Sequence, residues 1–318
     1  MSSDSVLFKS YYDLLNAGAT LKGDSFVLND NLYVPLMEAK LFWHYNHHYS
    51  AFPINVEKRP ESIPNVSSDE LQDVNFALKP WYWISSTEVE RATSKGNEPR
   101  SFVLAFRNIT NSTNERTMVA CLLPKDLPIG HSATCMVVNL NLCKKVILLS
   151  FLNSLILDYA LRQKITGMNM SIFIVKQLPV LRPEQIDEVN QWQLVKRVAE
   201  LTYFNHDMDE FAKDLSAELS QEQNDELGNR LIKQEPWVFD ELRRAQLQAE
   251  IDAIVAKLYG LNDDELKYIL DPEDIFGVGC IHETFRVLKN NEIKEFGEYR
   301  TKRLVLEAWD KLNQGNLF

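Results

Sequence analysis

Several features are scarce or missing in this 318-residue chain, and each absence excludes a class of protein. The chain has only four cysteines and no CxxC pair, so they are interpreted as free thiols in a reducing compartment. The N-terminus lacks a basic region followed by an apolar core, so no signal peptide is expected. The longest apolar run, Val146–Leu161, is interrupted by polar residues and is too short to span a bilayer. We therefore expect a cytoplasmic protein that does not enter a membrane.

The motifs of several enzyme classes are also missing. There is no GxGxxG string, no P-loop and no serine-centred GxSxG. There is no Pro-Pro dipeptide either, so the Asn/Asp-Pro-Pro-Tyr/Phe motif of amino-methyltransferases is absent. These absences predict that the chain is not an enzyme on its own and binds no cofactor.

Three histidines, His44, His47 and His48, have a spacing that metal ligands could use. Zinc and iron sites need three or four convergent ligands, and no acidic or cysteine partner accompanies these residues in the sequence. Packing within an aromatic-rich segment is therefore the favoured interpretation, and we predict no metal site.

A second group, Asp271 with Glu292 and Lys294, resembles the Asp…Glu-x-Lys site of many nucleases. That site needs its Glu and Lys on a strand, so that both point to the same side. Here the surrounding residues favour a helix start or a turn, which argues against nuclease activity.

The pattern of apolar residues predicts an α+β protein in two domains. Residues 1–183 are expected to form a mixed α/β domain, and residues 184–318 an acidic helical module that acts as a spacer or interaction surface. In the first domain we expect helices at 7–17 and 142–164, and strands at 25–28, 81–84, 101–106, 117–124 and 171–175. In the second we expect helices at 184–204, 207–218, 238–259, 263–270, 282–291 and 295–313. The net charge of −11 divides in the same way, at about +2 before residue 183 and about −13 from there onward.

Residues 100–183 form a basic island with a net charge of about +7. Arginine and lysine alternate there with asparagine, glutamine and threonine. These side chains suit phosphates and base edges, because Arg pairs with guanine and Asn or Gln with adenine in the major groove. A solvated basic face, or a surface that binds an acidic protein, would have a similar composition.

Five strings resemble the C-terminal target-recognition region of adenine-N6 DNA methyltransferases from type IIG, type ISP and related defence systems. They are Pro35-Leu-x-Glu-Ala-Lys with Tyr45-Asn-His-His, Arg107-Asn-Ile-Thr-x-x-Thr-Asn-Glu-Arg-Thr117, Leu152-Asn-Ser-x-x-Leu-Asp-Tyr with Arg162-Gln-Lys, Phe173-x-Val-Lys-Gln-Leu-Pro179 and Gly297-Glu-Tyr-Arg-Thr-Lys-Arg-Leu. The likeness covers most of residues 30–312. The chain departs from the family pattern at Asn46, His48 and Asn108, where we expect Asp, Arg and Asp.

The resemblance implies a DNA-recognition module without its catalytic domain. In that family a methyltransferase domain precedes this region, so we expect a fragment, a split-gene subunit or a recognition remnant. The missing domain would bind S-adenosylmethionine, and Mg²⁺ where it is required, flip the target adenine and methylate it. The alternative is a protein-interaction or inhibitory subunit that does not bind DNA itself.

The predicted DNA contacts divide into two roles. Phosphate contacts are expected from Arg100, Arg107, Arg116, Lys164 and Lys176. Base-edge or loop-positioning roles are expected from Asn114, Arg116, Arg162, Gln163 and Asn169. Glu115 and Asp158 are expected to hold arginine side chains in place, and Asp158 lies four residues before Arg162, the spacing of a helical ion pair.

Overall fold

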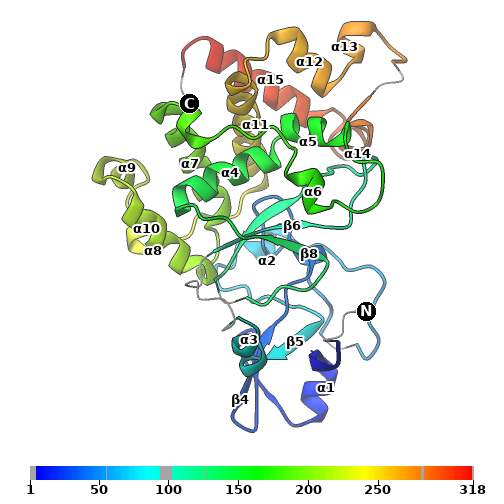
Figure 1. Cartoon of the computed structure of the whole chain (residues 1–318), viewed down its shortest axis with the longest axis vertical. Coiled ribbons are helices and arrows are strands. Elements are labelled where there is room, and N and C mark those ends of the chain that lie inside the picture. The colour runs from blue at the N-terminus through cyan, green and yellow to red at the C-terminus, as the bar shows by residue number, and fades with distance from the viewer. Residues whose placement is uncertain (1–4, 55, 94–101, 126, 281–282, 317–318) are drawn as a thin grey trace.

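The computed structural model describes residues 5–54, 56–93, 102–125, 127–280 and 283–316. They form an elongated molecule with strands toward the N-terminal end and helices toward the other (Figure 1). The predicted α+β class is confirmed. The predicted contact residue Arg100 lies outside the described residues.

A five-stranded antiparallel sheet with the order β1-β5-β4-β3-β2 forms the N-terminal end. Its strands are β1 (Lys9–Ser10), β2 (Thr20–Lys22), β3 (Ser25–Leu28), β4 (Asn31–Pro35) and β5 (Tyr82–Ser85). Between β3 and β4 the chain turns at Asn29 and Asp30, whose φ angles of 49° and 61° are those that a two-residue hairpin requires. Helix α1 (Tyr11–Asn16) covers the sheet and packs Leu14 into a small core with Phe26 and Trp83. Helix α3 (Ser86–Thr93) follows β5 directly.

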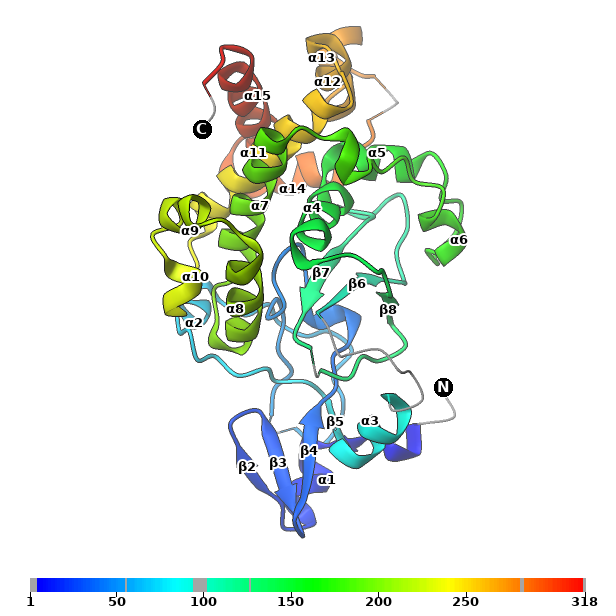
Figure 2. The ribbon, with the colours of Figure 1, turned by 60° about the vertical axis from the view of Figure 1, so that its left-hand side comes forward.

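A three-stranded antiparallel sheet with the order β7-β6-β8 lies between the first sheet and the helices (Figures 1 and 2). Its strands are β6 (Val103–Arg107), β7 (Ala120–Leu123) and β8 (Ala133–Met136). Alternate residues of β7 pack into two different hydrophobic cores, so all four side chains are buried. The strand therefore appears in the sequence as a continuous apolar run. The predicted pair of strands around a polar loop is confirmed.

Helices α4 (Leu142–Asn153) and α5 (Leu155–Arg162) occupy the stretch predicted as one helix. The helix breaks at Ser154, which has an extended ψ of 149°. Its hydroxyl accepts a hydrogen bond from Leu157 N (3.2 Å) and donates one to Phe151 O (2.8 Å). The prediction was wrong because the serine that caps α5 lies within a long, mostly apolar stretch, where periodicity alone does not reveal the break.

Residues 171–175, predicted as a strand, form the short helix α6 (Ile172–Val175). The hydroxyl of Ser171 caps this turn by accepting a hydrogen bond from Ile174 N (3.4 Å). The prediction was wrong because a short apolar run is compatible with either a strand or a buried helical turn.

The second half of the chain is helical, as predicted. Its longer helices are α7 (Glu188–Thr202), α8 (Asp209–Glu218), α11 (Glu241–Leu258), α12 (Asp263–Leu270), α14 (Arg286–Phe296) and α15 (Arg300–Asn313). The sequence did not predict three short helices of this half, α9 (Gln221–Glu226), α10 (Arg230–Lys233) and α13 (Glu273–Phe276). In the first half it did not predict the short helix α2 (Ser68–Leu71). Helix α14 ends at Gly297, whose φ of 77° is the left-handed conformation that closes a helix.

One large hydrophobic cluster joins the two halves. It runs from strands β6 and β7 through α4 and α5 to α7, α11 and α15. This shared core crosses residue 183, the predicted domain boundary. Figure 2 shows α4 lying between the three-stranded sheet and the C-terminal helices. None of the helices in the described ranges has the length and apolar character needed to cross a lipid bilayer.

Candidate nucleic-acid interface

The polar loop between β6 and β7 is held by a buried carboxylate on α5. Asp158 is fully buried and accepts hydrogen bonds from Arg116 Nε (2.7 Å) and Arg162 Nε (3.1 Å). Its two oxygens also accept from Thr117 N at 3.2 and 3.0 Å. The prediction that Asp158 holds arginine side chains is confirmed for both arginines. Glu115, predicted to do the same, instead accepts a hydrogen bond from Asn291 Nδ2 (2.9 Å).

The guanidinium of Arg162 fastens the loop by its backbone. Nη1 donates to Ser112 O (3.0 Å), and Nη2 donates to Asn114 O and Glu115 O (both 2.9 Å). Nη1 also donates to Thr284 O (2.7 Å), which links the loop to the C-terminal half of the chain. One planar side chain therefore binds three carbonyl groups of the loop backbone at once, which only the forked donors of arginine can do.

Burial and neighbouring charge act in opposite directions on Arg116. Burial alone would lower the pKa of its guanidinium, but the carboxylates of Asp158 and Asp252 outweigh this effect and raise it. Arg116 Nη2 also donates to Asn153 O (2.6 Å). The charge of Arg116 is therefore neutralised inside the protein and positions the loop rather than facing solvent.

A second segment runs beside this loop. Thr110 N donates to Met168 O (3.0 Å), and Met170 N donates to Asn108 O (2.8 Å), with Ile109 and Asn169 paired as an isolated antiparallel bridge. The exposed residues of 108–115 and 163–177, which we call the paired-loop surface, therefore lie on two segments joined by backbone hydrogen bonds.

Five of the predicted contact residues are exposed on the paired-loop surface. They are Asn114, Gln163, Lys164, Asn169 and Lys176. Within the described residues, neither Lys164 nor Lys176 forms an ion pair, so both ammonium groups are available to a ligand. Four large apolar side chains are exposed on the same surface, namely Ile109, Met168, Ile172 and Phe173.

The other predicted contact residues are placed differently. Arg116 and Arg162 lie buried beneath the loop. Arg107 is half-buried, donates to Phe42 O from Nε (3.1 Å), and stacks over Trp43 with 4.5 Å between its guanidinium carbon and the ring centre. Burial lowers the pKa of Arg107 to about 10. Five of the nine predicted residues therefore lie together at the surface. Three others, Arg107, Arg116 and Arg162, make their contacts within the protein.

The residues of the nuclease-like string do not form a nuclease site. Glu292 and Lys294 lie on helix α14, so side chains two positions apart point in different directions, as the sequence pattern indicated. The carboxylate of Glu292 accepts hydrogen bonds from Thr301 N (2.8 Å) and Thr301 Oγ1 (2.6 Å). Asp271 is paired with Lys289 and Lys302.

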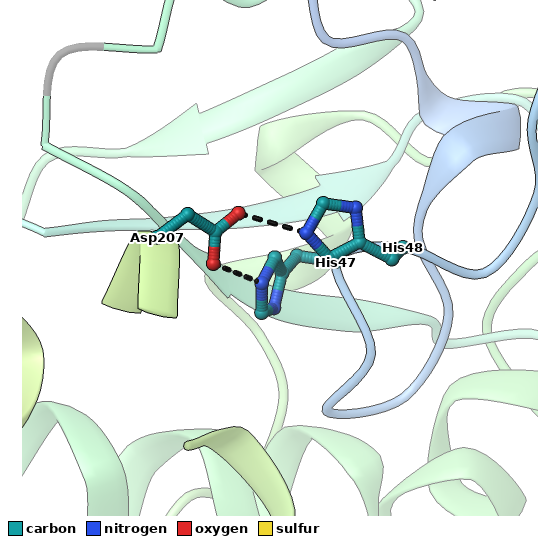
Figure 3. A group of neighbouring side chains, drawn as sticks. All are labelled: His47, His48 and Asp207. Carbon is teal, nitrogen blue, oxygen red and sulfur yellow. Dashed lines mark hydrogen bonds and ion pairs between the residues drawn. The ribbon is translucent and has the colours of Figure 1, made fainter. Parts of the chain in front are cut away.

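The three histidines separate into two roles. His44 is buried with Nε2 2.8 Å from Met118 O, and burial lowers its pKa well below the usual range. His47 and His48 instead turn toward one carboxylate, that of Asp207, which lies 160 residues later in the chain (Figure 3). The sequence contains no local signal for this partner, because only the fold brings residue 207 beside residues 47 and 48.

Comparison of the chain with models of known protein families, with curated protein sequences and with solved structures finds no match.

Proposed function

We propose that this chain is the DNA target-recognition module of a restriction–modification or related defence DNA methyltransferase. It would bind duplex DNA in the cytoplasm for a catalytic domain located elsewhere. That domain would bind S-adenosylmethionine, and Mg²⁺ where it is required, and carry out base flipping and methyl transfer. The observation that carries the proposal is the paired-loop surface, where two lysines without ion pairs among the described residues and three exposed amide side chains lie on a backbone that Arg162 holds from beneath.

Each group on this surface has a role in the proposal. Lys164 and Lys176 neutralise backbone phosphates. The amides of Asn114, Gln163 and Asn169 donate to and accept from base edges, as bidentate Asn and Gln contacts to adenine do. Arg116 and Arg162 contribute indirectly, because a recognition loop that is already ordered loses less conformational entropy on binding.

The negative charge of the second half is compatible with DNA binding if it faces away from the duplex. Helices α8, α9 and α10 lie across the molecule from α6 in Figure 2. At about 0.1 M salt, charges more than roughly 10 Å apart are largely screened. The acidic helical module would then serve as a spacer and as the contact surface for the methyltransferase partner.

Fluorescence-anisotropy titration of a random-sequence duplex over a range of salt concentrations tests the proposal. The logarithm of affinity should fall linearly with the logarithm of salt concentration, and Lys164→Ala combined with Lys176→Ala should lower the slope by about 2. The matched control combines Lys213→Ala with Lys233→Ala, which removes two exposed lysines from α8 and α10. It should leave the slope unchanged. Equal slopes for both variants would contradict the assigned surface.

A second candidate function rests on the four exposed apolar side chains. Ile109, Met168, Ile172 and Phe173 would suit a protein partner, as in a protein-interaction or inhibitory subunit. Absence of DNA binding even at low salt would reject the first proposal in favour of this one.

A further inference from the structure

We infer that His47, His48 and Asp207 form a binding site for a divalent transition metal ion, with Zn²⁺ as the best-fitting candidate. The inference does not depend on DNA binding. It begins with convergence: His47 Nε2 lies 2.8 Å from Asp207 Oδ1, and His48 Nε2 lies 2.8 Å from Asp207 Oδ2. The three ligand atoms lie within 4.8 Å of one another, and Figure 3 shows both rings directed at the carboxylate.

The backbone explains why two consecutive histidines face the same way. In a strand, neighbouring side chains point to opposite faces, but residues 47 and 48 lie in a turn. Asn46 Oδ1 accepts a hydrogen bond from His48 N (2.9 Å), and Tyr45 has a left-handed φ of 57°. This turn places both imidazoles on one side of the chain.

Both imidazoles are held firmly. Each ring is about 1% exposed and packs on aromatic neighbours, with 4.8 Å between the ring centres of His47 and Phe204 and 5.5 Å between those of His48 and Phe76. Among the described residues, neither Nδ1 atom has a hydrogen-bond partner. Each buried ring therefore makes its polar contact through Nε2 alone, toward Asp207.

The third ligand, Asp207, is held through its backbone, while its side chain is partly exposed. Asp207 N donates to Asn205 Oδ1 (3.1 Å), and Asn205 Nδ2 donates to Phe76 O (3.1 Å). The Asp207 side chain is 35% exposed. Tetrahedral zinc with bonds of about 2.0–2.1 Å separates its ligands by roughly 3.3 Å. The two 2.8 Å contacts would therefore lengthen slightly as both rings and the carboxylate turn toward one ion.

A cavity of about 200 Å³ lies beside the three side chains and gives an ion a path of entry. Its other walls are mostly apolar, formed by Val34, Pro35, Met37, Leu78, Pro124 and Leu127, with Asp24 and Ser25 as the polar lining residues. An ion bound by two nitrogens and one oxygen would keep a position for water facing this cavity, the arrangement of three protein ligands and one open position.

The donor set selects the class of ion. Imidazole nitrogens with one carboxylate suit zinc and other first-row transition ions, whereas calcium and magnesium prefer oxygen ligands alone. The acidic cluster of Asp271, Glu273 and Glu283 offers a contrast, because the Lys289 ammonium already lies 3.2, 2.6 and 2.7 Å from its three carboxylates. Among the described residues, no lysine or arginine forms an ion pair with Asp207.

The test is isothermal titration of the chelator-treated full chain with Zn²⁺, together with Co²⁺ absorption as a readout of coordination geometry. We expect one Zn²⁺ per chain, a four-coordinate Co²⁺ spectrum, and weaker binding at lower pH because protons compete for the imidazoles. Asp207→Asn should weaken Zn²⁺ binding by at least about tenfold. The matched control His206→Gln removes an exposed histidine from the adjoining position and should leave binding unchanged.

A second variant keeps the inference falsifiable if Asp207→Asn does not fold. His48→Gln preserves a polar side chain of similar length and should abolish the four-coordinate Co²⁺ spectrum, with folding checked by circular dichroism. Failure of the wild-type chain to bind Zn²⁺, or equal binding by wild type and Asp207→Asn, would overturn the site. Neither readout involves DNA, so the outcome is independent of the proposed function.

Discussion

At the level of single residues, Arg162 shows how burial changes the role of a charged side chain. The sequence indicated both a DNA contact and an ion pair with Asp158, and in the structure its guanidinium serves Asp158 and four backbone carbonyls. It also stacks on Phe285, with 4.6 Å from the guanidinium carbon to the ring centre. A residue with this many partners contributes to stability and loop order.

We predict that Arg162→Lys destabilises the protein by about 2–4 kcal/mol, because an ammonium cannot replace the forked donors and leaves part-buried carbonyls, together with the buried carboxylate of Asp158, less fully paired. Arg303→Lys, which alters an exposed arginine paired with Glu298 and Glu307, should cost about 1 kcal/mol or less. Chemical denaturation of both variants measures the difference. Similar losses in the two would contradict the assigned role of Arg162.

At the level of elements, the junction between α4 and α5 depends on the N-cap that Ser154 provides. Ser154 satisfies the first turn of α5, and Leu155 N donates to Asp252 Oδ1 (2.7 Å) from α11. Because the junction is buried, water cannot replace a lost cap. The break also sets the direction of α5, which carries Asp158 and Arg162 to the recognition loop.

Ser154→Ala should therefore lower the free energy of unfolding by about 2 kcal/mol, at the upper end of the range for lost N-caps. Ser220→Ala removes the equivalent cap from the short surface helix α9 and should cost about 0.5–1 kcal/mol. Urea denaturation compares the two variants. A smaller loss at Ser154 than at Ser220 would show that the buried break does not depend on its cap.

For the whole molecule, Asp252 lies where the two halves of the chain meet. It is buried on α11, contacts the start of α5, and shares its surroundings with Arg116 and Asp158. Burial raises the pKa of Asp252 to about 7, even though Arg116 acts to lower it. The shared core is thus sensitive to the protonation of one carboxyl group.

This raised pKa predicts a pH dependence of stability. An unfolded aspartate has a pKa of about 3.9, so between about pH 4 and 7 the folded state holds the proton more tightly, and the contribution of Asp252 to stability falls as pH rises. Asp252→Asn keeps an acceptor for Leu155 N and removes this dependence. Thermal unfolding of both proteins from pH 5 to 8 should therefore show the wild type losing stability relative to the variant. A constant difference across that range would refute the raised pKa.

By itself the sequence determined the α+β class, the two strands around the polar loop, and most helices of the second half. Their periodicities depend on which residues are buried, and burial leaves a local pattern. The pairing of Asp158 with Arg162 was predictable for the same reason, because four residues span one helical turn.

Only the tertiary structure decided what depends on distant contacts. Arg116 is buried against Asp158, 42 residues later, and the start of α5 is bound by Asp252, 97 residues beyond Leu155. Asp207 is the clearest case, since it meets His47 and His48 across 160 residues. The local sequence pattern indicates which face of an element is buried. How the elements pack decides which partner a buried residue contacts.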